Sequence, residues 1–264
     1  MTPATPLAPG LGATGGGVPI KVIRQRTSKD RLKMDWDYPV YVAPEEIAIE
    51  QSDDETVAAY QRRALAREES FDWIAGDDPR PLLVLRECKT CNGTDWALLN
   101  AREDNEKTLL LAQWFHCVKL PNDVLAEDHP FRNMFDGDMP PHLFVSSPDG
   151  SNMVPLRGDQ SRTELWEAMD TVLDLEYSRD AKKRVQDYMK LLVEFDTIDQ
   201  MQDWRQEQVE LAIEKHGPDS RQVKKARKQL EELEKRKKKA LEKEAALRDL
   251  GLKRKAPEAD AAAE

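Results

Sequence analysis

A short, continuous apolar run, "RPLLVLREC" from Arg80 to Cys88, most limits what this chain can fold into. Runs that are apolar at nearly every position are typical of strands buried on both faces of a sheet. The run ends at Cys88, and Cys91 follows it at a CxxC spacing. The next segment, "TDWALLNARED", is expected to continue as a helix. The sequence therefore predicts two thiols at the point where an interior strand meets a helix.

The segments around this run alternate between strand and helix patterns. Ser161 and Glu164 have the spacing of a capping box and predict the start of a helix. The predicted strands are Tyr38–Pro44 at an edge, Arg80–Cys88, Thr108–Pro121 in the interior, and two runs around a Ser-Pro-Asp-Gly turn within residues 140–158. The predicted helices are Asp53–Ala75 with Gly76 as its cap, residues 94–104, a short one through residues 129–135, and residues 161–175. The order β-α-β-α-β-α-β-β-α predicts a mixed α/β domain.

From about Tyr38 to Leu175 the chain resembles a thioredoxin-like domain, on this element order and on the motifs "CKTC" and "PPHLFVSSPDG". The resemblance implies a central mixed sheet flanked by helices, with the dithiol at the turn from strand to helix. It also implies roles for three residues: Cys88 as the attacking thiol, Cys91 as the resolving thiol, and Pro141 as a proline with a cis peptide bond beside them. We expect neither a cofactor nor a metal.

The residues around the dithiol depart from those of typical thioredoxins. Glu87 stands where an aromatic residue usually precedes the first cysteine, and Lys89-Thr90 replaces Gly-Pro. The stretch "PLLVL" also lacks the buried carboxylate that assists proton transfer in the family. A helix N-terminus favours the thiolate form of Cys88, and Lys89 adds to this effect whereas Glu87 opposes it. These departures are compatible with a specialised or slower oxidoreductase, or with a domain kept for binding.

Other interpretations of these motifs stay open. A zinc site needs two further ligands at suitable spacing, and the chain contains neither a second CxxC nor an HxxxH motif. The available ligands would be Cys117, His116, His129 and His142. The CxxC pair is otherwise structural or vestigial, and Pro140-Pro141 is otherwise an ordinary loop breaker. Cys117 lies in a predicted interior strand, where it is expected to pack as a small apolar residue.

Charge divides the chain into two parts. Residues 37–177 carry 12 Lys and Arg against 29 Asp and Glu, a net charge of −17, whereas residues 178–256 carry 22 against 16, a net charge of +6. The division supports a boundary near residue 176. We therefore predict a disordered basic segment at 1–36, a thioredoxin-like domain at 37–176, a helical hairpin or coiled coil at 177–252 and a disordered tail at 253–264.

The hairpin is predicted from two amphipathic helical segments that "GPDS" separates. Gly217 is the expected C-cap of the first segment and Ser220 the N-cap of the second. The second segment contains the basic run "KRKKK", which suggests nucleic acid binding, but glutamates interleave with it. This pattern favours a solvated, salt-bridged helix face, and we do not expect nucleic acid as a partner.

Two functions fit the sequence. The first is a thiol–disulfide oxidoreductase that acts on a protein disulfide through Cys88 and Cys91, with the helical extension selecting a partner. The second is a non-catalytic interaction protein that uses the hairpin as its binding arm. Any oligomer is expected to form through the C-terminal helices. The chain contains neither a membrane-span pattern nor a secretory signal pattern, so a cytoplasmic location is expected.

Overall fold

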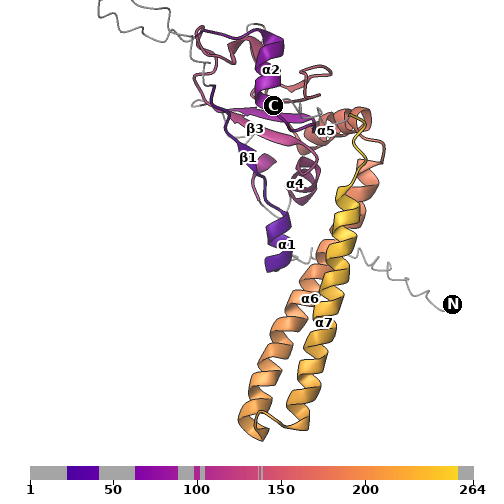
Figure 1. Cartoon of the computed structure of the whole chain (residues 1–264). Helices are drawn as coiled ribbons and strands as arrows, with labels where there is room; N and C mark the ends of the chain where they lie inside the picture. The colour runs from indigo at the N-terminus through magenta and orange to yellow at the C-terminus, as the bar shows by residue number, and fades with distance from the viewer. Residues whose placement is uncertain are drawn as a thin grey trace, which may run out of the picture.

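Strand β2 (Leu82–Arg86) lies in the middle of a five-stranded sheet, and every one of its residues is buried. The apolar run therefore predicted an interior strand correctly. The structure is a computed structural model, and it describes residues 23–41, 63–88, 98–101, 105–135, 137 and 139–254. Helices flank the sheet, and two long helices extend away from it (Figure 1). The chain is thus a mixed α/β domain followed by C-terminal helices.

The sheet is mixed, with the strand order β1-β3-β2-β4-β5. Both β1 (Trp36–Asp37) and β2 run parallel to β3 (His116–Leu120). Strand β4 (Leu143–Ser146) is antiparallel to β2, and β5 (Val154–Leu156) is antiparallel to β4. The β4–β5 pair confirms the two runs predicted around the Ser-Pro-Asp-Gly turn. The edge strand predicted at Tyr38–Pro44 is wrong over its described part, since residues 38–41 are not in a strand and the edge strand β1 ends at Asp37.

Alternate residues of β2 face two different apolar cores. Leu83 and Leu85 pack in a core that includes side chains of helices α5 (Arg162–Glu176) and α6 (Ala181–His216). Leu82 and Val84 pack in a second core with α2 (Arg67–Ala75) and the segment around the 3-10 helix η2 (Arg132–Met134). Because β2 is covered on both sides, its apolar positions are continuous rather than alternating.

The predicted strand Thr108–Pro121 is wrong in its first half. Helix α4 (Glu106–Ala112) occupies that half, and β3 begins only at His116. An apolar run of this length fits a buried helix as well as a strand, and three successive leucines followed by alanine favour the helix. The helix predicted from Asp53 also begins later, since α2 starts at Arg67 and residues 63–66 are not helical. Residues 53–62 and most of 94–104 lie outside the described residues.

Helix α5 (Arg162–Glu176) begins at the predicted capping box. The Ser161 hydroxyl accepts a hydrogen bond from the Glu164 N–H, and the Glu164 carboxylate accepts one from the Ser161 N–H at 2.7 Å. At the end of α2, Gly76 adopts φ of 53° and its N–H donates to the carbonyl of Asp72. Both helix ends therefore follow from local sequence.

Helices α6 (Ala181–His216) and α7 (Arg221–Arg248) form the predicted hairpin, which projects from the domain (Figure 1). Gly217 ends α6, and the Ser220 hydroxyl caps α7 by accepting from the Val223 N–H. The first turns of α6 belong to the same core as β2, so the core does not stop at residue 176. Within the part of the chain that is described, no helix combines the length and apolar character needed to cross a bilayer.

The segment before β1 is ordered, contrary to the expectation of disorder for this part of residues 1–36. It contains helix α1 (Arg26–Arg31), which packs against α6. The Thr27 N–H and hydroxyl both donate to the Asp199 carboxylate of α6, and Thr27 is buried. Polar contacts with a distant segment order these residues, and such contacts leave no apolar pattern in the sequence.

The basic run of α7 pairs differently from the prediction. Arg236 and Lys243 bind Glu194 of α6 at 3.4 and 3.2 Å, and Lys237 binds Asp199 at 2.8 Å. Of the five interleaved glutamates, Glu244 forms ion pairs within the described residues, with Arg248 along α7 at 2.9 Å and with Arg31 at 3.2 Å, whereas Glu231, Glu232, Glu234 and Glu242 form none there. The cations of the run therefore tie the two helices together rather than bridging along one helix.

Candidate dithiol site

Cys88 lies at the carboxyl end of the central strand. The Arg86 N–H donates to the His142 carbonyl on the β4 side, and the Glu87 N–H donates to the Leu120 carbonyl on the β3 side. The backbone therefore remains extended up to Cys88, which is half-buried. Cys88 is disulfide-bonded. Cys91 and Lys89, which carry the other half of the predicted motif, lie outside the described residues.

The segment Pro140-Pro141-His142 lies beside this strand end. Strand β4 pairs Leu143 with Leu85, so continuing the antiparallel register places Pro141 and Pro140 opposite residues 87 and 88. The predicted proximity of Pro141 to the first cysteine is thus supported by the register. The predicted cis bond is wrong, since no peptide bond among the described residues is cis. Pro141 is buried against the strand end with a trans peptide bond.

Arg86 brings a buried positive charge to this site. Its side chain donates to the carbonyl oxygens of Pro141 and Pro140 at 3.4 Å each, and one of its nitrogens lies 3.3 Å from Nε2 of His142. Within the part of the chain that is described, Arg86 forms no ion pair with a carboxylate. Burial away from water lowers the pKa of Arg86, because the charged form is the one that loses hydration.

Glu87, the acidic neighbour that was expected to oppose a thiolate at Cys88, is paired. Its carboxylate lies 2.8 Å from Lys119 Nζ on the adjacent strand β3. Lys119 also lies 5.8 Å from the ring centre of Tyr38, beyond the end of β1. The pair reduces the negative field that Glu87 alone would place beside Cys88.

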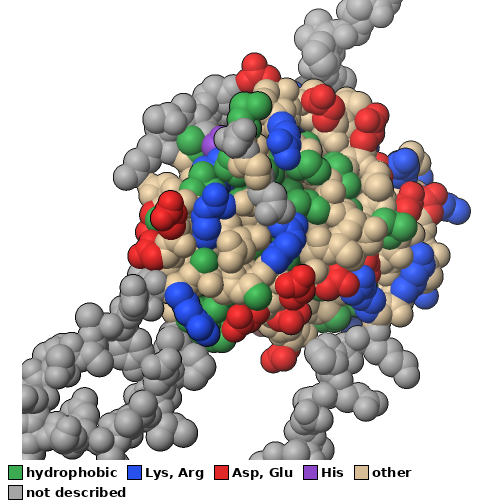
Figure 2. Space-filling view, turned by 90° about the horizontal axis from the view of Figure 1, so that it is seen from above, with side chains coloured by type: hydrophobic (Ala, Val, Ile, Leu, Met, Phe, Trp, Pro, Cys, Tyr) green, Lys and Arg blue, Asp and Glu red, His purple; other side chains and the backbone are tan. Residues whose placement is uncertain are grey.

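Exposed apolar side chains accompany these charges. Tyr38 and Val40, which follow β1, are 59% and 74% exposed, and Met139, just before Pro140, is 76% exposed. Figure 2 shows exposed hydrophobic side chains scattered among Lys, Arg, Asp and Glu on the face seen from above. Such a mixed surface suits an extended polypeptide better than a polyanion, since its charges have both signs.

Of the alternative zinc ligands, His142 lies at the Cys88 end of the sheet, opposite Arg86, but the other three do not join it there. His116 and Cys117 pair with Leu82 and Leu83, at the opposite end of the sheet and about 20 Å from Cys88 at the ordinary strand rise. His129 is buried, and its Nδ1 accepts the Phe131 N–H at 3.2 Å. Over the described ranges, no group of three or more His, Cys, Asp and Glu side chains could hold a metal ion.

Cys117 packs in the core, as predicted. It is a free thiol with 4% exposure, and its sulfur contacts the carbonyl oxygens of Ala112 and Phe115. Burial raises the pKa of Cys117 to about 12. This thiol is therefore protonated and unreactive at neutral pH.

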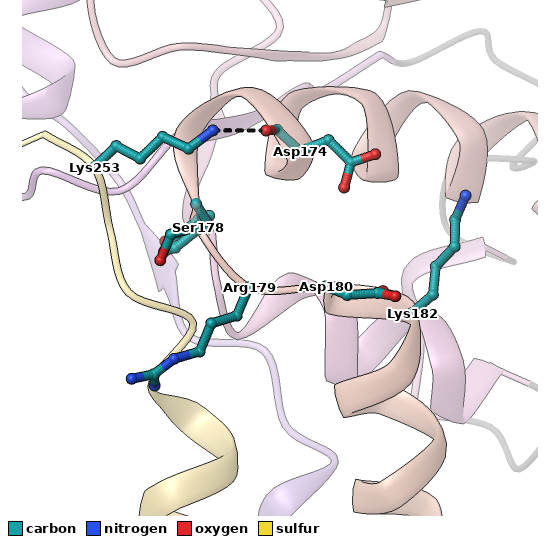
Figure 3. Close-up of a pocket in the computed structure, with 7 residues that line it drawn as sticks. Asp174, Ser178, Arg179, Asp180, Lys182 and Lys253 are labelled. Atoms are coloured by element: carbon teal, nitrogen blue, oxygen red, sulfur yellow. Dashed lines mark hydrogen bonds between the residues drawn. The ribbon is translucent and has the colours of Figure 1, made fainter.

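A polar cavity of about 460 Å³ lies far from the dithiol, between the end of α5 and the start of α6 (Figure 3). Its three cations all have partners within the chain. Lys253 Nζ donates to the Asp174 carbonyl, Arg179 binds Asp249, and Lys182 lies 3.6 Å from Asp170. Figure 3 shows the Lys253–Asp174 contact, one of several bonds that hold the C-terminal segment to α5. We therefore assign the cavity's charges to holding the chain together.

Comparison of the chain with protein-family models, curated proteins and solved structures finds no match. The site must therefore be interpreted from its own geometry. The sequence singled out Cys88 and Pro141. It did not indicate that Arg86 and Lys119 belong to the site, or that His142 lies beside Arg86. One feature of the sequence pointed to Arg86, since it is the first charged residue after the apolar stretch that begins at Pro81.

Proposed function

We propose that the chain catalyses thiol–disulfide exchange through Cys88 and Cys91, on a thioredoxin-like domain. The observation that carries the proposal is the place of Cys88, at the carboxyl end of the central strand with Pro140-Pro141 opposite. The mixed sheet with helices on both faces and the hairpin β4–β5 followed by α5 support the same domain type. Cys88 is half-buried rather than enclosed in the core, which is compatible with attack on a macromolecular substrate.

The exchange proceeds in two displacements. The Cys88 thiolate attacks one sulfur of a substrate disulfide, forming a mixed disulfide and releasing the other substrate sulfur as a thiolate, which takes a proton. The Cys91 thiolate then attacks the Cys88 sulfur, and the second substrate sulfur leaves as a thiolate. Two electrons pass from the dithiol to the substrate, and the enzyme becomes the Cys88–Cys91 disulfide. The reverse sequence oxidises a substrate dithiol.

The charged groups near Cys88 affect how readily it forms a thiolate and exchanges protons. Lys119 neutralises Glu87, so the acidic residue before Cys88 opposes the thiolate less than its charge suggests. Strand β2 contributes no carboxylate for proton transfer, because its residues from Leu82 to Leu85 are all aliphatic. The function therefore fits a specialised oxidoreductase better than a general disulfide reductase.

The test is trapping of the mixed disulfide. The variant Cys91→Ser should form a stable adduct with a peptide disulfide at Cys88, and Cys88→Ser should form none, as measured by mass spectrometry of the intact protein. The unmodified chain should interconvert reversibly between dithiol and disulfide across glutathione buffers. If no disulfide forms between Cys88 and Cys91 at any glutathione ratio, the oxidoreductase proposal is wrong.

A second candidate function is a non-catalytic interaction protein that uses the helical arm. Five large apolar side chains remain exposed at helical spacing along one side of α6, namely Met189, Val193, Met201, Trp204 and Leu211. Large apolar side chains in such a row are more typical of a protein contact than of a solvated face. In this case Cys88→Ser would leave the protein's activity in cells intact, whereas Trp204→Glu together with Val193→Glu would abolish it. The two functions therefore predict opposite results for the cysteine variant.

A further inference from the structure

Arg86 is a buried cation in a place where the fold itself supplies no anion. Its residue exposure is 7%, and its side chain bonds only to two backbone carbonyls and approaches one imidazole. A buried guanidinium usually pairs with a carboxylate, because carbonyl oxygens alone compensate poorly for lost hydration. In the resolved surroundings of Arg86, such a carboxylate is absent. The charge therefore needs either an anion that is present only in one state of the protein, or an anion from outside.

The register places the guanidinium at the level of Cys88. The side chain starts at Arg86, opposite His142, but its donors reach the carbonyls of Pro141 and Pro140, which stand opposite residues 87 and 88. The side chain thus runs along the strand toward the end where Cys88 lies.

Arg86 and Cys88 also project from the same face of the sheet. Successive side chains of a strand point to opposite faces, and β2 remains extended through Glu87, whose N–H bonds to β3. Leu82 and Val84 face the core that α2 covers, so Arg86 and Cys88 follow on that side. Two side chains at this spacing start about 7 Å apart, a gap that the long arginine side chain can cross.

We propose that the Arg86 guanidinium is the counter-ion of the Cys88 thiolate, and that this pairing makes the dithiol an oxidant of substrate thiols. The inference rests on the proposed function. In the disulfide form Cys88 is neutral and Arg86 has no anion, whereas reduction creates the thiolate beside it. Stabilising the reduced form raises the reduction potential of the pair, which is the property of an oxidising dithiol.

The oxidising direction balances as follows. A thiolate of the substrate dithiol attacks the Cys88 sulfur of the Cys88–Cys91 disulfide, and Cys91 leaves as a thiolate that takes a proton. The second substrate thiolate attacks the mixed disulfide, and Cys88 leaves as the thiolate that Arg86 stabilises. The substrate loses two electrons and two protons, and a low-molecular-weight disulfide restores the enzyme by accepting the same two electrons.

Among the described residues, the other charged groups at this end of the sheet are paired or exposed. Glu87 is paired with Lys119, and the imidazole of His142 approaches Arg86 itself. Arg157, beyond β5, is exposed and donates to the Met139 carbonyl at 3.2 Å. Of these groups, Arg86 is the cation that is both buried and on the side of Cys88. Arg157 offers a matched control, because it is the same residue type at the same end of the sheet.

The test measures the pKa of Cys88 in a Cys91→Ser background from the pH dependence of thiolate absorbance. Cys117 does not interfere, since its pKa is raised to about 12. Replacing Arg86 with Gln, which keeps donors for the Pro140 and Pro141 carbonyls, should raise the Cys88 pKa by about one unit. Arg86→Lys, which keeps the charge, should raise it less, and Arg157→Met should leave it unchanged. Circular dichroism checks that each variant is folded. If Arg86→Gln does not fold, Arg86→Met takes its place in the comparison.

The reduction potential of the chain with both cysteines intact gives an independent readout. A tenfold loss of thiolate stabilisation in Arg86→Gln should make the potential about 30 mV more negative. An unchanged Cys88 pKa and potential in a folded Arg86→Gln variant would overturn this inference while leaving the oxidoreductase proposal standing. If the chain forms no reversible Cys88–Cys91 disulfide, both this inference and the oxidoreductase proposal are wrong.

Discussion

The Arg24 guanidinium binds Glu106 through two parallel hydrogen bonds, each 2.6 Å long, and so fastens the N-terminal segment to α4. A third nitrogen donates to Asp196 of α6 at 2.7 Å. The side chains of Arg24, Glu106 and Asp196 are 7 to 9% exposed. One arginine therefore joins three segments that lie far apart in the sequence.

Replacing Arg24 with Met should destabilise the protein by about 3–5 kcal/mol, because both carboxylates would stay buried without their cation. The measurement is the free energy of unfolding in urea. Arg26→Met is the control: its side chain is 61% exposed, pairs with Asp203 at 3.1 Å and only reaches 4.0 Å from Asp199, so its loss should cost about 1 kcal/mol or less. If both variants lose the same unfolding free energy, the buried pairs do not hold the N-terminal segment in place.

Asp199 should make stability depend on pH in the acidic range. Burial alone would raise its pKa, but hydrogen bonds from Lys237 and Thr27 outweigh burial and lower it. Since the folded pKa lies below the unfolded value of about 3.9, the stabilisation is complete above that pH and is lost as pH falls through the folded pKa. The unfolding free energies of wild type and Asp199→Asn should therefore differ at neutral pH and converge in acid.

The control for this measurement is Asp203→Asn, a change at a carboxylate that is 60% exposed and pairs with Arg26. It should alter stability by about 1 kcal/mol or less. If the difference in unfolding free energy between wild type and Asp199→Asn stays constant down to strongly acidic pH, the Asp199 charge does not have the proposed role.

Much of the fold could be predicted because its signals are local. The capping box of Ser161 and Glu164, the caps Gly217 and Ser220, and the apolar run of β2 each act within a few residues. The N-terminal segment could not be predicted in this way. Arg24 and Thr27 are ordered by carboxylates that follow 172 residues later, and no local pattern reports such partners.

The candidate site also combines features that local sequence predicts with features that depend on distant contacts. The apolar run predicted that Cys88 follows an interior strand, and the second motif drew attention to Pro141. The pairing of Glu87 with Lys119 and the reach of Arg86 to Pro140 depend on the register between neighbouring strands. Register follows from the packed sheet as a whole, so these contacts became visible only in the structure.

Cys117 should resist alkylation in the folded protein. Its thiol is buried, and burial raises its pKa to about 12, so neither access nor ionisation favours reaction. After reduction, treatment with iodoacetamide near neutral pH should leave Cys117 unmodified in buffer and modify it in concentrated urea. Peptide mass spectrometry identifies the modified residue. Rapid labelling of Cys117 without urea would mean that the core around β3 opens readily.

Gly150 in the β4–β5 turn should tolerate alanine poorly. Its φ is 75°, and a Cβ atom there would overlap the ring of Phe71, a fully buried residue of α2. Gly158 provides a matched control, since its φ of 69° imposes the same backbone strain but its Cβ would meet open space. Gly158→Ala should therefore cost about 1–2 kcal/mol for strain alone. Gly150→Ala should cost this amount plus about 1–3 kcal/mol for overpacking, measured by urea unfolding.

A second substitution separates the overlap from the strain. In Phe71→Leu the smaller side chain leaves room for the added methyl group, so Gly150→Ala should cost less in that background than in wild type. The double-mutant cycle should then give a coupling energy of about 1 kcal/mol or more, as expected for side chains in direct contact. If Gly150→Ala and Gly158→Ala cost the same, or if the coupling is zero, the Phe71 ring does not limit this turn. A nonzero coupling would instead establish that the aromatic core beneath α2 fixes the path of the hairpin, and with it the position of β4 beside Cys88.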